Sequence, residues 1–167
     1  MADPFAHLQK FDMTSLAMSE SLDGDKAWAS DFTWPEIESL AVHTAPYKAK
    51  KGTVIVNEGD TERYMGIVLV GQLDVFKKAT GGKDKPLAQI TRGKTFGEMS
   101  LIDGEPRSAS LIAAFDATLL IITHEHMTKL NDEAPRLGFK FLLKVSRLLS
   151  QRLRQTSGIL ADKISEQ

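Results

Sequence analysis

The chain of 167 residues contains no cysteine. This absence excludes disulfide bridges, thiolate nucleophiles and cysteine ligands for a metal, and it fits a reducing compartment. The sequence also has no run of about 20 apolar residues, the length that a membrane-spanning helix needs, and no basic segment followed by an apolar run at its N-terminus. We therefore expect a cytoplasmic protein without a membrane span.

An excess of charge of one sign is missing as well. The 21 lysines and arginines nearly balance the 22 aspartates and glutamates, and the formal net charge is −1. This balance gives no electrostatic basis for general binding of DNA or of an anionic membrane surface. The four histidines are scattered along the chain without a carboxylate cluster at metal-ligand spacing, so we expect no metal site and no cofactor.

Short strand-forming runs fill the middle of the chain. Six runs between Tyr47 and Thr123 are rich in β-branched residues and are separated by turn-forming residues: TVIVN, YMGIVLV, LDVFKK, PLAQI, SASLIAA and ATLLIIT. Regular short strands of this kind predict a mainly β member of the α+β class, an antiparallel β-barrel or jelly roll with flanking helices. Gly81 and Gly82 predict the tip of one hairpin.

Helical patterns flank these strands. Pro35 opens an amphipathic helix over residues 35–43. Thr123 is a candidate N-cap for a short helix that ends near Asn131, and a long helix begins around Pro135. The long helix carries an apolar stripe of about 20 residues, which either packs on its own domain or pairs with a second copy; we favour the homodimer.

We expect three parts along the chain. Residues 1–31 form an N-terminal leader, residues 32–157 form one domain that ends in the long helix, and residues 158–167 form a short tail. A single domain agrees with a length of 167 residues and a hydrophobic content of 42%. The leader places Phe5, Leu8 and Phe11 at helical spacing, and either a short docking helix or a disordered tail fits this segment.

The segment Phe96–Ser110, FGEMSLIDGEPRSAS, has the residues that a sugar phosphate needs. Gly97 lacks a Cβ, so backbone N–H groups can approach an anion closely, and a helix beginning at Glu98 favours negative charge at its N-terminus. Arg107 adds a planar fork of donors that suits a phosphate. A carboxylate repels a phosphate, so Glu98 makes sense as the acceptor of a hydrogen bond from a hydroxyl such as the ribose 2′-OH.

The neighbours of Arg107 allow other interpretations. Glu98 and Arg107 could form a structural ion pair that fixes a turn instead of binding a ligand. Ser108 and Ser110 follow the arginine at a spacing of two, so on a strand their hydroxyls share one face while Ala109 points to the other. In that arrangement Ser108 could donate a hydrogen bond to a phosphate or a base.

The segment resembles the phosphate-binding cassette of the cyclic nucleotide-binding domain family, which includes catabolite activators and the regulatory subunits of protein kinases. The match runs through F-G-E-M-S-L and, after a short loop, through P-R-S-A-S. The upstream stretches KGTVIV, EGD and VLVGQL resemble the family's first barrel strands and their glycine turns. Altogether the resemblance covers residues 34–157.

This resemblance implies a site for a cyclic mononucleotide. Glu98 would hold the ribose 2′-hydroxyl and Arg107 the cyclic phosphate, with backbone or hydroxyl contacts from neighbouring residues. The full set of implied ligand-binding residues is Phe96, Gly97, Glu98, Met99, Ser100, Arg107, Ser108 and Ala109.

In this family the last helix acts as a lid over the base. The run Arg152–Ser157 resembles the stretch of bacterial catabolite activators whose Thr-Ser pair meets adenine, which makes Thr156 and Ser157 candidate base contacts. The alternative is that these two residues and Gly158 only end the helix.

The short stretch after the lid helix sets the expected role. Bacterial transcription factors of the family continue into a winged helix-turn-helix, whereas this sequence stops shortly afterwards, and we find no pseudosubstrate or second binding domain. We therefore expect a stand-alone sensor, bacterial by resemblance, that binds no DNA and signals through a separate effector protein.

Several ligands agree with these residues. Cyclic AMP is expected first, because the Thr-Ser pair favours adenine, and cyclic GMP is the alternative, because Ser108 could serve a guanine edge. A cyclic dinucleotide receptor and a nucleotide-independent scaffold are further alternatives, although a scaffold has no need for the pair Glu98 and Arg107. No enzyme is expected, since no general base, nucleophile or metal site lies near the segment.

Overall fold

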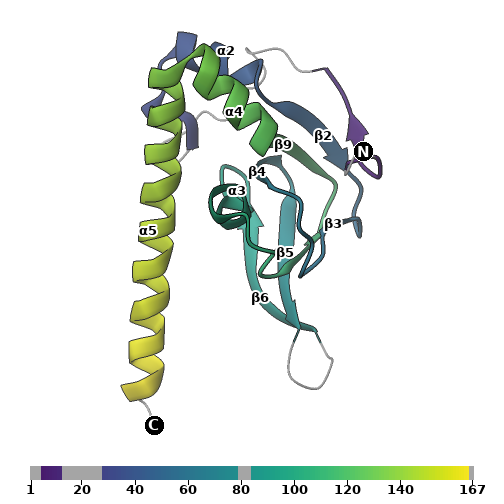
Figure 1. Cartoon of the computed structure of the whole chain (residues 1–167). Coiled ribbons are helices and arrows are strands. Elements are labelled where there is room, and N and C mark those ends of the chain that lie inside the picture. The colour runs from purple at the N-terminus through teal and green to yellow at the C-terminus, as the bar shows by residue number, and fades with distance from the viewer. Residues whose placement is uncertain (1–4, 13–27, 79–83, 166–167) are drawn as a thin grey trace. The chain divides into compact units, whose positions relative to one another are not determined.

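The computed structural model describes residues 5–12, 28–78 and 84–165, and Figure 1 shows its helices and strands. The chain divides into two compact units, residues 1–129 and residues 130–167. The hairpin tip predicted at Gly81 and Gly82 lies outside the described residues.

Two sheets form the first unit. One has five strands in the spatial order β1-β2-β9-β4-β7, and the other has four strands in the order β3-β8-β5-β6. Their bounds are β1 Gln9–Lys10, β2 Ala45–Ala49, β3 Val54–Val56, β4 Tyr64–Val70, β5 Gln72–Lys78, β6 Asp84–Thr91, β7 Thr95–Phe96, β8 Ser110–Ala113 and β9 Ala117–Thr123. Each strand pair among the described residues is antiparallel. The predicted antiparallel β fold is confirmed, and each of the six predicted runs contains a strand.

The two sheets share one hydrophobic core. Val68, Leu119 and Ile121 of the five-stranded sheet and Leu73 of the four-stranded sheet are fully buried in it. Burial of a side chain of this size contributes about 1.5–3 kcal/mol. Because a slip of one residue would turn a strand's apolar side chains outward, this burial fixes the strand register.

The N-terminal leader joins the same core through a turn and a strand. Phe5 and Leu8 are buried in the cluster, the Leu8 N–H donates to the Phe5 carbonyl oxygen at 2.8 Å, and β1 pairs with β2 (Figure 1). Neither the predicted docking helix nor a flexible tail is observed over residues 5–12. The spacing of three residues between Phe5 and Leu8 suits a single turn as well as a helix, and here the turn brings both side chains inward.

Two short helices lie between β1 and β2 in the chain. The 3-10 helix η1 (Trp28–Asp31) leads into α2 (Trp34–Ala41), which confirms the helix predicted over residues 35–43. Thr33 caps it in a capping box, in which the Thr33 N–H donates to Glu36 Oε2 at 2.7 Å. This reciprocal bond satisfies backbone donors that the first helical turn leaves without partners.

Helix α4 (His124–Glu133) follows β9 directly. The His126 N–H donates to Thr123 Oγ1 at 3.2 Å, so the predicted N-cap residue does cap this helix. The helix ends at Glu133, two residues beyond the predicted end near Asn131.

The second unit contains the long helix α5 (Pro135–Ser165), which begins at the predicted proline. It continues through Gly158 without a break, so the alternative in which Thr156–Gly158 end the helix is wrong. Its last turns carry exposed apolar side chains, among them Leu153, Ile159 and Leu160. None of the helices in the described parts of the chain is long and apolar enough to cross a membrane.

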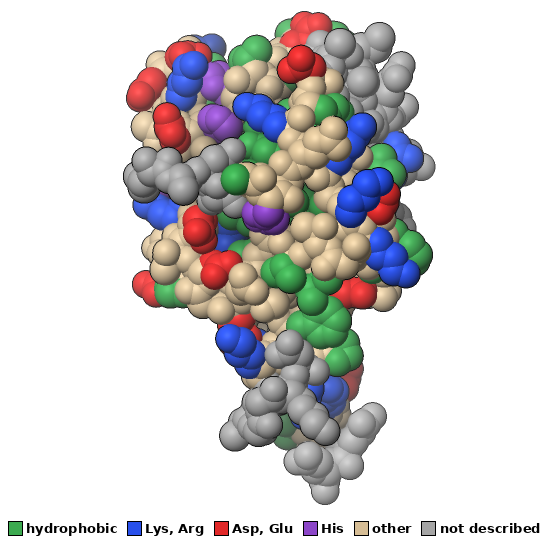
Figure 2. Space-filling model, turned by 90° about the vertical axis from the view of Figure 1, so that its right-hand side faces the viewer, with side chains coloured by type: hydrophobic (Ala, Val, Ile, Leu, Met, Phe, Trp, Pro, Cys, Tyr) green, Lys and Arg blue, Asp and Glu red, His purple; other side chains and the backbone are tan. Residues whose placement is uncertain are grey.

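Positive and negative side chains are interspersed on the face that Figure 2 shows. This distribution agrees with the formal net charge of −1. On the described residues of this face, the basic groups therefore form no continuous stripe.

A close approach between β4 and β7 positions Phe96, the first residue of the segment Phe96–Ser110. Gly66 pairs with Phe96 across the two strands, and a Cβ at Gly66 would collide with the Phe96 ring. Phe96 itself is buried. The ring therefore occupies the volume that a side chain at position 66 would need.

We predict that Gly66→Ala lowers the free energy of unfolding by about 1–3 kcal/mol, because the Phe96 ring must move inside a packed core. The same substitution in a Phe96→Leu background should lower it less, since the smaller side chain leaves room for the methyl group. Urea unfolding followed by tryptophan fluorescence measures both differences. Equal losses in the two backgrounds would contradict the role assigned to the ring.

Candidate functional site

The candidate site is built between β7 and β8. Gly97 caps the short helix α3 (Glu98–Asp103) with φ +76°, a conformation that favours glycine. The helix packs beside β4 and confirms the predicted helical start at Glu98. After α3, an extended segment brings Arg107 back toward the glycine.

The backbone of Arg107 is held by the loop between β3 and β4. The Arg107 N–H donates to the Asp60 carbonyl oxygen at 2.8 Å, and the Gly59 N–H donates to the Arg107 carbonyl oxygen at 2.9 Å. Two hydrogen bonds in opposite directions fix this residue against a loop that is distant in sequence. The starting point of the arginine side chain is therefore well defined.

The side chain of Arg107 is buried, with 4% of the residue's surface exposed. Its Nη1 donates to the Gly97 carbonyl oxygen at 3.2 Å, and its Cζ lies 4.0 Å from the centre of the Tyr64 ring. A Cβ at Gly97 would collide with Nη1 and would lie 2.7 Å from the Tyr64 carbonyl oxygen. Glycine is thus required at position 97 for both the backbone conformation and the space.

One edge of the guanidinium has no partner. Among the described residues, neither Nε nor Nη2 of Arg107 has a hydrogen-bond partner, although both are buried. These two N–H groups lie side by side on one edge of the planar group, the arrangement that binds two oxygens of a carboxylate or phosphate. This edge of Arg107 makes no hydrogen bond to Glu98 in the described part of the chain, although the Glu98 carboxylate acts electrostatically to raise the pKa of Arg107.

Burial and the neighbouring groups shift the pKa of Arg107 in opposite directions. Burial lowers the pKa of its guanidinium from the ordinary value, while Tyr64, Glu62, Asp60 and Glu98 act to raise it. A guanidinium starts from such a high pKa that it stays charged at neutral pH. A buried charge without a hydrogen-bonded counterion is unfavourable, so this edge of the site is suited to an anion.

Glu98 is buried in the first turn of α3, with 2% of its surface exposed. The Thr95 hydroxyl donates to Glu98 Oε1. An ionised carboxylate has two oxygens and about four acceptor positions and donates no hydrogen bond. The chemistry of Glu98 therefore suits the acceptor role that the sequence predicts for it.

The segment after Arg107 differs from the prediction. Ser108 precedes β8 in a bend and is exposed, so Ser108 and Ser110 do not share a face of one strand. Lys77 Nζ donates to the Ser108 carbonyl oxygen at 2.6 Å and pairs with Glu58 Oε1 at 2.7 Å. The Glu58 N–H in turn donates to Ser110 Oγ at 2.9 Å. Regular pairing with β5 begins only at Ser110, opposite Phe76, so these bonds hold Ser108 outside the strand.

The other predicted site residues are distributed over the two units. Phe96 and Ser100 are buried, Met99 is exposed and Ala109 is half-buried. Thr156 and Ser157 lie in α5, in the second unit. Their contact with a base stays a prediction.

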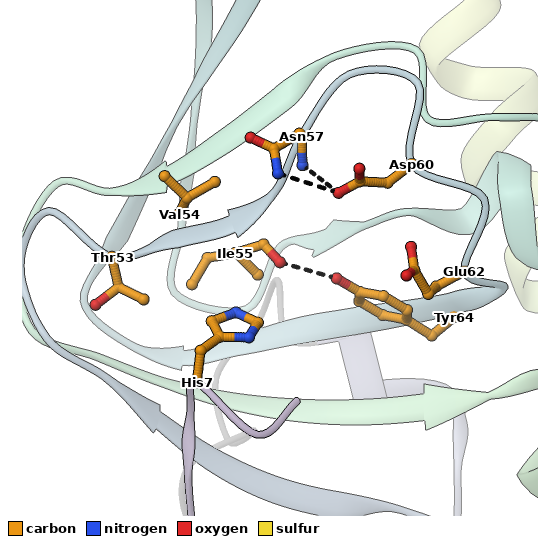
Figure 3. A pocket seen from close by; sticks show the side chains of 8 residues that line it. All are labelled: His7, Thr53, Val54, Ile55, Asn57, Asp60, Glu62 and Tyr64. Carbon is orange, nitrogen blue, oxygen red and sulfur yellow. Dashed lines mark hydrogen bonds between the residues drawn. The ribbon is translucent and has the colours of Figure 1, made fainter. Parts of the chain in front are cut away.

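A cavity of about 410 Å³ in the first unit shares Tyr64 and Asp60 with the surroundings of Arg107. Figure 3 shows the eight side chains that line it: His7, Thr53, Val54, Ile55, Asn57, Asp60, Glu62 and Tyr64. None of the predicted ligand-binding residues is among them. The carboxylates of Asp60 and Glu62 would repel a phosphate, so the cavity is not the site of an anionic ligand.

Two residues near Arg107 were missed by sequence reasoning. Tyr64 was interpreted only as the start of a strand, and Lys77 only as part of another. Both contacts cross between segments that are far apart in sequence, and a single sequence carries no signal for such a contact. The apolar run that contains Tyr64 indicates burial, but it does not indicate which group the ring meets.

Comparison with known proteins agrees with this geometry. The family pattern described as cyclic nucleotide-binding domain matches residues 47–133. The cyclic AMP receptor protein of Thermus thermophilus is 33% identical over 105 residues, which cover 63% of this chain and 47% of that protein. The chain spans about half the length of the curated relatives it matches.

Solved structures show the same architecture. A cyclic nucleotide-binding domain from Methylobacillus flagellatus gives a TM-score of 0.84 at 25% identity, covering 98% of this chain and 93% of that chain. The catabolite activator protein of Thermus thermophilus gives 0.72 at 29% identity, covering 83% of this chain and 62% of that one.

The buried hydroxyl of Tyr64 predicts a dependence of stability on alkaline pH. Burial raises the pKa of Tyr64 from 10.0 to about 12, so the unfolded chain loses this proton first as the pH rises. The stabilisation that the protonated Tyr64 gives the folded state is fully present below pH 10. It is lost as the pH rises from about 10 to about 12, and the free energy of unfolding falls by about 2–3 kcal/mol over this range. Urea unfolding at several pH values should show a steeper fall for the wild type than for Tyr64→Phe. Parallel curves would contradict the burial effect.

Proposed function

The chain belongs to the cyclic nucleotide-binding domain family, and from this premise we propose that it binds a cyclic mononucleotide at Arg107 and Glu98. Arg107 binds the cyclic phosphate and Glu98 accepts a hydrogen bond from the ribose 2′-hydroxyl. Gly97 leaves the space in which the guanidinium lies.

One observation carries this proposal. The Nε and Nη2 groups of Arg107 are buried and have no partner among the described residues. A cyclic phosphate has two exocyclic oxygens that can accept these two parallel N–H groups. Its single negative charge also balances the buried guanidinium, which an uncharged ligand would leave uncompensated.

The position of Glu98 supports a sugar rather than a free phosphate. Its carboxylate is buried at the start of the helix that follows Gly97, and it already accepts the Thr95 hydroxyl. A ribose presents the same kind of donor. A ligand that joins an anion and a free hydroxyl would satisfy Arg107 and Glu98 together.

We favour cyclic AMP over cyclic GMP. The relative in Thermus thermophilus is a cyclic AMP receptor protein, and the Thr156–Ser157 pair matches residues that meet adenine in catabolite activators. Cyclic GMP is the second candidate because the Ser108 side chain is exposed beside Arg107 and could contact a guanine edge. A cyclic dinucleotide belongs in the same screen.

The proposed role is that of a sensor without catalysis. Binding changes the equilibrium between two states only if the ligand has a different affinity for each. A separate effector protein would read this change, and the exposed apolar residues of α5 would support a homodimer. A nucleotide-independent scaffold is the alternative in the event that no cyclic nucleotide binds.

We predict that isothermal titration with cyclic AMP or cyclic GMP gives saturable binding to the nucleotide-free protein. Arg107→Ala should weaken it by about 100-fold or more, because it removes a buried charge that pairs with the phosphate. Arg92→Ala, at an exposed arginine, serves as the matched control and should bind as the wild type does. Unchanged affinity in Arg107→Ala would exclude the assigned site, and no binding of any nucleotide would favour the scaffold.

We predict that Glu98→Gln removes the preference for ribose. The wild-type protein should bind the cyclic nucleotide about tenfold more tightly than its 2′-deoxy analogue, because a hydrogen bond to a charged acceptor is lost. Glu98→Gln should show a much smaller ratio, whereas Glu105→Gln, at an exposed glutamate two residues after α3, should keep it. Full discrimination by Glu98→Gln would overturn the role of this carboxylate.

A further inference from the structure

We propose that Tyr64 is a positioning residue for the anion-binding arginine and that Phe5, in the N-terminal segment, holds Tyr64 in place. This inference rests on the proposed function, because it concerns the Arg107 that would bind the phosphate. It makes residues 5–10 part of the nucleotide site although none of them belongs to the cassette segment.

The Tyr64 ring is fixed by contacts at two places. Its hydroxyl donates to the Ile55 carbonyl oxygen at 3.1 Å (Figure 3). Its ring meets the Phe5 ring edge-on, with the ring centres 4.7 Å apart and an angle of 76° between the planes. Phe5 also contacts Tyr47 with ring centres 5.0 Å apart. The ring therefore has little freedom to tilt.

This fixed ring determines how the guanidinium lies. Arg107 Cζ is 4.0 Å from the ring centre, within the range in which a cation is attracted to an aromatic face. The Gly97 carbonyl oxygen accepts a hydrogen bond from Arg107 Nη1. With Nη1 bound in this way, the edge that carries Nε and Nη2 is the one that can bind a phosphate. Because the planar guanidinium lies against the planar Tyr64 ring, this edge keeps one direction.

The contact with Phe5 extends the site to the N-terminal segment. Phe5 reaches Tyr64 because residues 5–8 form a turn, closed by the Leu8 N–H and the Phe5 carbonyl oxygen at 2.8 Å. The next residues pair with β2, with Gln9 opposite Lys48 and Lys10 opposite Tyr47. Because coupling between two equilibria is reciprocal, docking of this segment strengthens nucleotide binding, and the nucleotide strengthens docking.

Tyr64 could instead act only as a core residue, and a double-mutant cycle separates the two roles. Tyr64→Phe keeps the ring and removes the hydroxyl, whereas Tyr64→Leu keeps an apolar side chain and removes the ring. If Tyr64 acts through the guanidinium, Tyr64→Leu should matter less in an Arg107→Lys background, because an ammonium group has no plane to align with the ring. A purely structural loss would weaken binding equally in both backgrounds.

The experiment is isothermal titration of the full chain with cyclic AMP, or with cyclic GMP if only that nucleotide binds. Each variant is titrated at a temperature where its circular dichroism shows it to be folded. We expect Tyr64→Phe to bind within about twofold of the wild type and Tyr64→Leu to bind about tenfold more weakly, a factor within the range of cation–π contacts. In the Arg107→Lys background the same leucine should change the affinity by less than about threefold.

Phe5 is tested with a matched pair on the same segment. Phe5→Leu should weaken nucleotide binding by about threefold, less than Tyr64→Leu does, because Phe5 acts on Arg107 only through the Tyr64 ring. Phe11→Leu should leave the affinity unchanged, because Phe11 contacts Lys48 at 4.8 Å rather than Tyr64. This pair also tests the proposal if Tyr64→Leu does not fold, since equal affinities in the two leucine variants would overturn the role of Phe5.

The outcomes also separate this proposal from the function on which it rests. If the wild type binds no cyclic mononucleotide, the proposed function itself fails. If the wild type binds and Arg107→Ala does not, but Tyr64→Leu binds as well as Tyr64→Phe, the function stands and the positioning role is overturned. An equal weakening by Tyr64→Leu in both backgrounds also overturns it.

Discussion

A guanidinium that is almost completely buried, and whose Nε and Nη2 groups lack a partner among the described residues, is unfavourable for a folded chain. Burying the charge of Arg107 carries a desolvation cost, and such an arrangement persists only when other contacts hold it. The backbone bonds to Gly59 and Asp60, the Gly97 carbonyl and the Tyr64 ring supply those contacts. These contacts hold the guanidinium in one orientation.

The rest of the β-sandwich can be understood as the support for this arrangement. Strand β4 contributes Tyr64, which contacts Arg107, and Gly66, which leaves room for the Phe96 ring. One strand therefore positions both Phe96, just before α3, and Arg107, just after it. On the other side of the segment, Glu58 and Lys77 connect three separate stretches of backbone around Ser108. Contacts of this kind fix the arginine from several directions without using its outer edge.

Sequence reasoning predicted the parts of the molecule that depend on local patterns. Strands such as β4 and β9 are apolar runs between turn residues, and α2 is explained by Pro35 and its cap, so their physical signals lie within a few residues. Glu98 and Arg107 were identified because their chemistry is contained in one short segment.

The parts that sequence reasoning did not predict depend on distant contacts or on small energy differences. The contact of Tyr64 with Arg107 depends on how distant strands pair. The leader was ambiguous because the spacing of Phe5 and Leu8 suits a helix and a turn equally. Helix α5 extends past Gly158 because one glycine disfavours a helix by only about 1 kcal/mol, less than its helix-forming neighbours contribute together.

The unbroken course of α5 has a mechanical consequence. Its 31 residues, at 1.5 Å of rise for each residue, form a rod about 46 Å long. Turned by about 10° around its first residue, such a rod would carry its far end through about 8 Å. A rotation too small to disturb local packing thus becomes a displacement comparable to the width of a helix. Gly158 lies close to the far end of this rod and has open space around it, so a bend of the helix at this glycine would move only its last turns.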